Sequence, residues 1–256
     1  MKKISVLIQT RTGSSRLPNK VLKTIEGKPA IWHVINRVKQ IESVEQIALI
    51  TTKKPEDKIL LKIAEENRII GFAGNELDVL DRYFQCAKEI KSDPIIRISS
   101  DCPLIDPFLS EKILQYYLSN DFDYVSNTIT PTFPDGLDTE IFSYEALEKA
   151  SCEAKLPSER EHVTPYFIKH PEKFKISNYV NDSDLSNLRW TLDQGQDLAF
   201  IQEIYSRMKP KTIFSMNEIL NILSSNPELL EINKGIQRNE GRKPSLEKDK
   251  ELLAKK

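Results

Sequence analysis

Residues 4–22, ISVLIQTRTGSSRLPNKVL, decide the fold of this chain. The stretch opens with an almost continuous apolar run from Ile4 to Ile8, which is typical of a strand covered on both faces in a parallel sheet. The residues that follow are small or cationic, and Pro18 excludes regular structure among them. Because ligands of open α/β sheets bind beyond the carboxyl ends of the strands, we expect this loop to lie at a ligand site.

The loop after this strand carries fixed positive charge. Its three cations stand among small residues that let a ligand approach the backbone: Arg11, Arg16 and Lys20, with Thr10, Thr12, Gly13, Ser14 and Ser15. Such a loop at a strand end suits a polyphosphate, and we expect a triphosphate. An ordinary solvated basic turn is the alternative that a short motif of this kind leaves open.

Two familiar phosphate-binding loops are excluded. The P-loop requires Gly-Lys-Ser/Thr, whereas Asn19 precedes Lys20 and Val21 follows it. The dinucleotide-binding pattern requires three glycines, and Gly13 is the only glycine of this loop. The cations must therefore contribute more of the binding than they do in those loops.

The composition limits the partners of the chain. Its 256 residues carry a formal net charge of −1, so there is no basic surplus for a nucleic-acid partner. Three cysteines without Cys-x-x-Cys spacing indicate neither a disulfide framework nor a zinc knuckle. The apolar start is too short for a secretory signal and no run approaches membrane-spanning length, so we expect a cytoplasmic protein without membrane contact.

Strand and helix signals alternate after the first loop. This alternation predicts an α/β fold with a doubly wound, mainly parallel sheet, right-handed crossovers and helices on both faces. The expected strands lie at 46–51, 69–72 and 94–99, and the expected helices follow Pro29 and Pro55 and cover 77–90.

The pattern loosens from residue 120. Short strand signals, including 174–180 and 188–192, alternate there with turns, and a small insertion of this kind commonly shapes a substrate pocket or a dimer contact.

The end of the chain changes character. Beyond Asn226 the charged sequence has little apolar periodicity, which predicts an extended or mobile arm. We therefore divide the chain into a main domain, residues 1–225, and a charged C-terminal arm, residues 226–256.

Two acidic residues end strand patterns. Asp101 follows the strand at 94–99, and Asp193 follows the apolar alternation at 188–192. Carboxylates at the carboxyl edge of a sheet face the same crevice as the cationic loop, and two of them suit Mg²⁺, which prefers oxygen ligands shared with substrate phosphates. A strand-end turn former is the alternative role for either acid.

Asp106 and Asp197 are better placed as helix caps, since each stands at the start of a helical run. With a metal between Asp101 and Asp193, the cations of the loop would hold a departing diphosphate while the metal activates phosphorus. This chemistry requires positioning and charge stabilisation rather than a nucleophile triad.

Seven segments together give the sequence a family resemblance. It resembles the cytidylyltransferases that include the CMP-sialic acid and CMP-3-deoxy-manno-octulosonate synthetases, and looks closest to their spore-coat-polysaccharide branch. The segments, in family order, are RTGSSRLPNKVL, LDVLDRYFQCA, RISSDCPLIDP, DYVSN, FPDGLDTEIFS, SEREHVTPYF and RWTLDQGQDL.

The resemblance implies a nucleotide-diphospho-sugar transferase-like fold, CTP as donor, Mg²⁺, release of pyrophosphate and a homodimer. It also implies nucleotide contacts from the loop and a metal held by Asp101 and Asp193. Asn19 stands where the family has glycine, and Asn commonly replaces glycine in a left-handed conformation, so we expect the loop shape to be kept. The residues implied at the triphosphate are Arg11, Ser14, Arg16 and Lys20, with Thr10 and Gly13 beside them.

Other matched segments suggest further contacts. By analogy with the family, Arg82 faces the base and could read the cytosine carbonyl, the alternative being an exposed helix salt bridge. Glu159, Arg160 and His162 concentrate charge that would bind a hydroxyl-rich or anionic acceptor, with His162 a candidate base, although a lone histidine is more often structural. Asp135, in a turn signal, is expected at the edge of the acceptor pocket.

The leading function is transfer of CMP from CTP to a sugar hydroxyl, phosphate or phosphonate, in surface polysaccharide or glycan precursor synthesis. The alternative enzyme is a nucleotide-sugar-dependent glycosyltransferase that uses the Asp-x-Asp pair Asp121 and Asp123. A nucleotide sensor without turnover is the non-enzymatic alternative.

Overall fold

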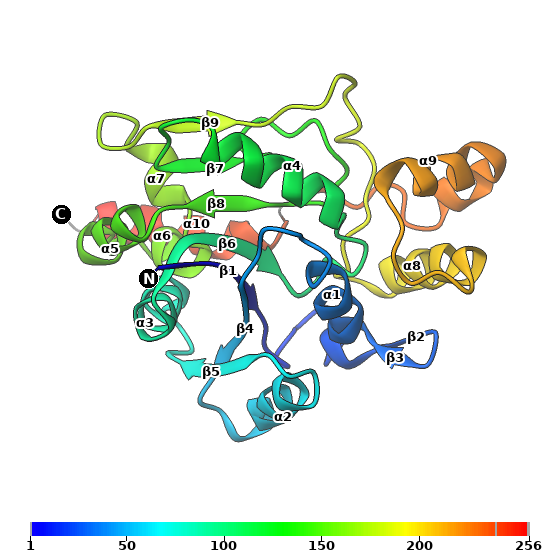
Figure 1. The fold of residues 1–256 in the computed structure, drawn as a ribbon, viewed down its shortest axis with the longest axis horizontal. Coiled ribbons are helices and arrows are strands. Elements are labelled where there is room, and N and C mark those ends of the chain that lie inside the picture. Colours follow the sequence, from blue (N-terminus) through cyan, green and yellow to red (C-terminus); the bar gives the residue numbers. More distant parts are fainter. Residues whose placement is uncertain (1, 239, 255–256) are drawn as a thin grey trace.

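The computed structural model describes residues 2–238 and 240–254. A seven-stranded sheet forms its centre, in the order β5-β4-β1-β6-β8-β7-β9 (Figure 1). β8 runs antiparallel to its neighbours and the other pairings are parallel, so the mainly parallel sheet is confirmed. The strands are β1 (Lys3–Gln9), β4 (Gln46–Thr52), β5 (Ile70–Gly74), β6 (Ser92–Ser99), β7 (Tyr124–Ser126), β8 (Glu140–Phe142) and β9 (Ile176–Asn178), and a small hairpin pairs β2 (Thr24–Ile25) with β3 (Lys28–Pro29).

Apolar cores cover both faces of the sheet. In β1, Val6 and Ile8 belong to one core and Leu7 to the other, and all three are fully buried. The first strand is therefore covered on both faces, as its apolar run predicts. Helices α1 (Ala30–Val38), α2 (Lys58–Glu66), α4 (Pro107–Leu118), α8 (Gly195–Met208) and α9 (Met216–Ser225) contribute to the first core, and α3 (Val79–Ile90), α5 (Tyr144–Glu153) and α7 (Pro165–Lys169) to the second.

The expected helix caps are confirmed. Asp106 accepts from two backbone amides in the first turn of α4, at 2.9 and 3.2 Å. Asp197 lies in the first turn of α8 and accepts from the amides of Asp193 and Gln194, both at 2.9 Å. Both carboxylates satisfy amides that have no partner within the helix.

The strand expected at 188–192 is wrong. Arg189 forms an isolated β-bridge with Asp135, and the other residues of the segment have no regular secondary structure. Trp190 and Leu192 are fully buried, so the apolar alternation reflects packing into the core rather than a ladder of strand pairing.

The extended conformation expected for the arm is also wrong. Over its described residues the arm forms the short 3-10 helices η3 (Pro227–Glu231) and η4 (Glu240–Arg242) and the helix α10 (Lys243–Ala254). Figure 1 shows α10 in red beside α6 (Pro157–His162), behind the sheet. A few residues of this charged segment are buried, which its average composition does not indicate. Residues 239 and 255–256 of the expected arm lie outside the described residues.

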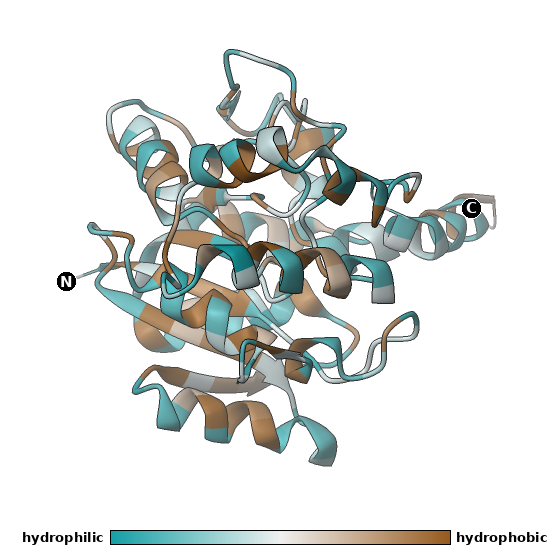
Figure 2. Cartoon of the chain, turned by 90° about the vertical axis from the view of Figure 1, so that its right-hand side faces the viewer, coloured by the Kyte–Doolittle hydropathy of each residue, from teal (hydrophilic) through white to brown (hydrophobic). Residues whose placement is uncertain are grey.

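Figure 2 shows helices that carry hydrophobic residues on one side and hydrophilic residues on the other, as expected for helices that cover a sheet. Among the described residues, no helix has the length and apolar character needed to cross a membrane.

Candidate active site

Charged residues from three parts of the chain meet beyond the carboxyl ends of β1 and β6. Lys20, which begins the 3-10 helix η1 (Lys20–Leu22), donates to Oδ2 of Asp101 at 2.7 Å and to Oδ1 of Asp193 at 2.5 Å. One ammonium group thus contacts both carboxylates. The two acids therefore lie close enough to share a single cation.

Asn19 determines how the chain enters η1. Its backbone is left-handed, with φ 55° and ψ 33°. Asn tolerates this conformation better than most residues other than glycine, so the substitution keeps the turn, as expected.

A backbone contact brings Asp193 to Asp101. The amide of Leu192 donates to the carbonyl of Asp101 at 2.7 Å, and the hydroxyl of Thr191 donates to the same carbonyl at 3.1 Å. These bonds fix the segment before Asp193 against the end of β6. Proximity of the two acids thus depends on a contact between loops and not on adjacent strands.

The electrostatics of this cluster favour the charged forms. Burial of Lys20 opposes its charge, but Asp101 and Asp193 outweigh that effect and raise the pKa of Lys20. Burial likewise opposes ionisation of Asp101, yet the Lys20 ammonium holds the pKa of Asp101 at about 2. Asp101 is therefore a carboxylate at neutral pH and available to a cation.

Arg16 extends the cluster toward solvent. Its Nη2 lies 3.2 Å from Oδ2 of Asp193, and its side chain is 37% exposed, against 14% for Lys20. A guanidinium that is partly exposed to solvent at the edge of this cluster can bind a phosphate group. The structure thus brings Arg16, Lys20, Asp101 and Asp193 together.

The first residues of the cationic loop lie outside this cluster of ion pairs. Arg11 and Gly13 are exposed and Ser14 is half-buried. The hydroxyl of Thr10 is buried and has no hydrogen-bond partner among the described residues. The nucleotide contacts expected from these four residues stay predictions.

Asp57 anchors the loop and was missed by the sequence analysis. Its Oδ1 accepts from the amide of Thr12 at 2.8 Å and from the Thr12 hydroxyl at 2.7 Å, and its Oδ2 accepts from the hydroxyl of Thr52. Asp57 is 1% exposed and ends the 3-10 helix η2 (Pro55–Asp57). Its position after Pro55 signals a helix start, but no local pattern indicates the distant loop.

Gly136 allows a close approach of two loops. Its φ is 110°, and a Cβ there would lie 2.6 Å from the carbonyl carbon of Trp190 and 2.7 Å from the nitrogen of Thr191. Only glycine fits, which explains the Asp-Gly turn signal. The approach sets Asp135 beside Arg189, whose Nη1 lies 3.1 Å from Oδ2 of Asp135.

Arg189 connects the acids of the site and was also missed. It contacts Asp197 through Nε at 2.9 Å and Asp193 through Nη2 at 3.5 Å, in addition to Asp135. Burial and the nearby Asp138 raise the pKa of Asp135 to about 7, although Arg238 and Arg189 act against the rise. Burial of Asp135 beside a second carboxyl thus favours its protonated form more than in an ordinary exposed aspartate.

The donor set fits a metal shared with a substrate. No group of three or more His, Cys, Asp and Glu side chains within residues 2–238 and 240–254 is arranged to hold a metal. Two carboxylates that already share one cation suit Mg²⁺, which commonly takes one or two acids and completes its shell with phosphate and water oxygens. Asp101 and Asp193 are the residues that would hold it.

The family model described as cytidylyltransferase matches residues 5–237. The chain belongs to the cytidylyltransferase family. It is a CTP-dependent nucleotidyltransferase, as the seven matched segments implied.

Relatives and solved structures agree with this family. The spore coat polysaccharide biosynthesis protein SpsF of Bacillus subtilis is 28% identical over 246 residues, covering 89% of this chain and 97% of that protein. A cytidylyltransferase structure from Leptospira borgpetersenii has a TM-score of 0.88 at 32% identity, covering 93% of this chain and 100% of that one. CMP:2-keto-3-deoxy-manno-octonic acid synthetase complexed with CTP shares the fold, with a TM-score of 0.63 at 18% identity and coverage of 80% and 99%. The nucleotidyltransferase-like fold is therefore confirmed.

Arg82 has backbone partners within the fold, and its expected base-reading role stays a prediction. Its Nε and Nη2 donate to the carbonyl of Asn75 at 2.9 and 2.6 Å, and Nη2 also donates to the carbonyl of Glu76 at 2.9 Å. These bonds occupy the directional donor pair. The alternative of an exposed helix salt bridge is wrong, because Arg82 is 1% exposed. Arg82 instead fixes the loop before α3.

Two residues expected at the acceptor have structural partners instead. Glu159 is 3% exposed and accepts from the amides of Lys155 and Leu156 at 3.2 and 3.1 Å, which caps α6. Arg160 pairs with Asp78, the N-cap of α3. Their charges have partners within the fold, and the acceptor role of both stays a prediction.

His162 contacts the C-terminal arm. Its Nε2 lies 2.8 Å from the hydroxyl of Ser245 in α10. Burial, together with the charges of Arg242 and Arg97, lowers the pKa of His162 to about 4. The imidazole is therefore neutral at pH 7, and its low pKa makes it a weak base. A catalytic role for His162 stays a prediction.

The Asp-x-Asp pair lies away from the cluster. Asp121 pairs with Lys175 at an exposed position, and Asp123 accepts from the Lys175 amide at 2.8 Å. These acids join the segment before β7 to the residue before β9, so the observation that favoured a glycosyltransferase has a structural explanation.

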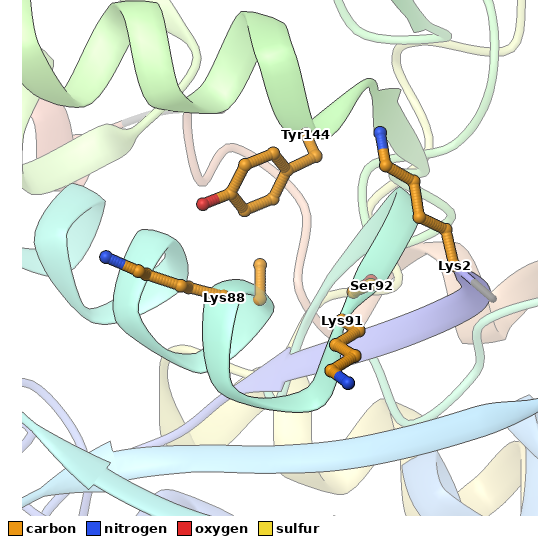
Figure 3. Close-up of a pocket in the computed structure, with 6 residues that line it drawn as sticks. Lys2, Lys88, Lys91, Ser92 and Tyr144 are labelled. Carbon is orange, nitrogen blue, oxygen red and sulfur yellow. The ribbon is translucent and has the colours of Figure 1, made fainter.

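A cavity of about 350 Å³ lies at the opposite end of the sheet, by the start of β1 and β6. Figure 3 shows the lysines that line it, Lys2, Lys88 and Lys91, with their nitrogens turned in different directions. Lys2 is also paired with Asp93 at 2.9 Å. These cations do not converge as a phosphate site would require.

Proposed function

We propose that this cytidylyltransferase transfers CMP from CTP to an acceptor oxygen and releases pyrophosphate, with Mg²⁺ held by Asp101 and Asp193. The observation that carries the proposal is the contact of one ammonium group, that of Lys20, with both carboxylates at the carboxyl edge of the sheet. A divalent ion bound there would offset repulsion between the attacking oxygen and the α-phosphate.

In this proposal Lys20 has two positions. Without substrate its ammonium pairs with the two acids, and when a metal and CTP enter, the ammonium moves to the phosphates. Arg16 binds the same phosphates from the solvent side and stabilises the charge that develops on the departing pyrophosphate. Arg11 and Ser14 add contacts at the start of the loop.

The acceptor group is a sugar hydroxyl, a phosphate or a phosphonate. Asp135 lies at the edge of the pocket that binds this acceptor. Likeness to the spore coat polysaccharide protein supports a role in polysaccharide or glycan precursor synthesis. We also propose a homodimer, which light scattering on the purified protein would test.

Pyrophosphate release measured with each of the four nucleoside triphosphates, against a panel of acidic sugars and phosphorylated polyols, tests the proposal. We expect release with CTP and one class of acceptor, and only with Mg²⁺ or a similar ion. Turnover of a nucleotide-sugar without pyrophosphate release would instead establish the glycosyltransferase. CTP binding without turnover against every acceptor would favour a sensor.

A further inference from the structure

The C-terminal arm contacts the acceptor edge of the site through Arg238. Its Nη2 donates to Asp138 at 2.6 Å and its Nη1 donates to the carbonyl of Phe133 at 3.2 Å, while its Nε lies 3.7 Å from Asp135. The arm therefore contacts the loop that contains Gly136. The same loop packs closely against Trp190 and Thr191, just before Asp193. Arg238 and the helices after it lie beyond residues 5–237, the part that the family model matches.

The arm also reaches the cationic loop. Oε2 of Glu240, the first residue of η4, lies 3.8 Å from Nη1 of Arg16. A Cβ on the next residue, Gly241, would lie 3.4 Å from Nη2 of Arg16. Arg16 is thus held between Asp193 on one side and the backbone and carboxylate of the arm on the other.

A carboxylate and a phosphate bind a guanidinium in the same way, through oxygen atoms in the plane of its N–H groups. The Glu240 carboxylate lies 3.8 Å from the Arg16 guanidinium, on a group that a phosphate would also bind. Both partners are partly exposed, Arg16 at 37% and Glu240 at 33%. Ion pairs of that exposure are weak and are screened by salt, so a highly charged ligand can replace this one.

The rest of the arm is held more firmly. Ser245 and Asp249 are 1% and 5% exposed. Ser245 bonds to His162, and Asp249 accepts from the amide of Ser158 at 2.9 Å and from its hydroxyl. These contacts anchor α10 on α6 independently of Glu240, so Glu240 can leave Arg16 without release of the helix.

We propose that Glu240 is an internal competitor for the triphosphate: it neutralises Arg16 in the free enzyme and is displaced when CTP binds. This inference rests on the proposed function, since it needs Arg16 to bind phosphate. It assigns to the arm a control of substrate affinity that is set by one carboxylate.

The test compares Glu240→Gln with Glu247→Gln, an equal loss of charge at an exposed position of α10. Dissociation constants of CTP, pyrophosphate and cytidine are measured by calorimetry at fixed ionic strength with Mg²⁺ present. We expect Glu240→Gln to bind CTP and pyrophosphate about two- to fivefold more tightly than wild type, with cytidine unchanged. Glu247→Gln should match wild type, and equal thermal melting would show that both variants fold.

A second measurement uses Arg16→Ala as background. There Glu240→Gln should no longer change pyrophosphate affinity, because the coupling acts through Arg16. If Glu240→Gln binds pyrophosphate no more tightly than Glu247→Gln, the proposal that Glu240 competes with the triphosphate is wrong. The proposed CTP turnover would not be affected by that result. If no protein of the series binds CTP or pyrophosphate, the proposed function fails with it.

Discussion

The backbone amide of Leu192 donates a 2.7 Å hydrogen bond to the carbonyl of Asp101. Residues that are distant in the sequence are thereby joined at the end of β6, and Asp193 follows directly. The contact explains how two acids that do not end neighbouring strands come to share the ammonium of Lys20. The candidate metal site is therefore a product of loop packing.

Asp101→Asn should lower the rate of pyrophosphate release about 100-fold or more without unfolding the protein, because the amide cannot replace a carboxylate toward Mg²⁺. Arg16→Ala should have a similar effect through loss of charge stabilisation. Assays at saturating CTP and Mg²⁺, with circular dichroism for the fold, check both. Asp121→Asn is the control, an exposed acid that should keep full activity; full activity in Asp101→Asn would remove that residue from the mechanism.

Lys20→Met should strengthen binding of a divalent ion in the absence of CTP by about tenfold, while activity is lost. The ammonium offsets part of the negative charge of the two carboxylates, and its removal makes the site more negative, so that it attracts a cation more strongly even with Arg16 and Arg189 still beside Asp193. Titration with Mn²⁺ followed by electron paramagnetic resonance measures the affinity.

Lys23→Met, a change of the same charge just beyond η1, is the control for the Lys20 variant. Equal Mn²⁺ affinity in wild type, Lys20→Met and Lys23→Met would mean that Lys20 does not occupy the metal position.

Asp57→Ala should lower the free energy of unfolding by about 2 to 4 kcal/mol, because it leaves the amide and hydroxyl of Thr12 and the hydroxyl of Thr52 without their buried acceptor. Urea unfolding measures the loss. The Michaelis constant for CTP should also rise, since the cationic loop loses its anchor. A variant that is destabilised but binds CTP normally would show that Asp57 supports the fold and not the loop.

His162 predicts a pH dependence of stability. Its pKa is about 4 in the folded protein and 6.5 as the ordinary value, so the unfolded chain binds a proton first as the pH falls. Protonation of His162 in the unfolded chain alone favours unfolding. The folded protein is therefore most stable, as far as His162 is concerned, above pH 6.5, and it loses stability as the pH falls toward 4. Between pH 7 and pH 5 the loss is about 2 kcal/mol.

Urea unfolding at the two pH values checks the His162 prediction. His162→Gln should remove that part of the pH dependence, whereas His170→Gln, at a partly exposed position, should keep it. An unchanged slope in His162→Gln would assign the pH dependence to other groups.

The sequence by itself determined the class of fold and several of the charged residues that form the central cluster. A run such as Ile4 to Ile8 can be stable only when both faces are covered, and the parallel sheet with two cores follows from it. Asp106 and Asp197 were identified as caps because capping is a local interaction, set by adjacent residues. Arg16 and Lys20 were identified because they stand among small residues in a loop that directly follows a buried strand.

Only the tertiary structure decided which charges are satisfied and by what. Arg82, Glu159 and Arg160 are polar residues in matched segments, yet their partners are carbonyls, amides and a cap that no local pattern indicates. Asp57 and Arg189 acquire their roles through contacts with distant loops. The arm is similar, since a few inward-facing residues such as Ser245 fix a segment whose average composition is that of a disordered chain. Local pattern sets periodicity and capping, whereas burial and charge pairing depend on residues that only the folded chain brings together.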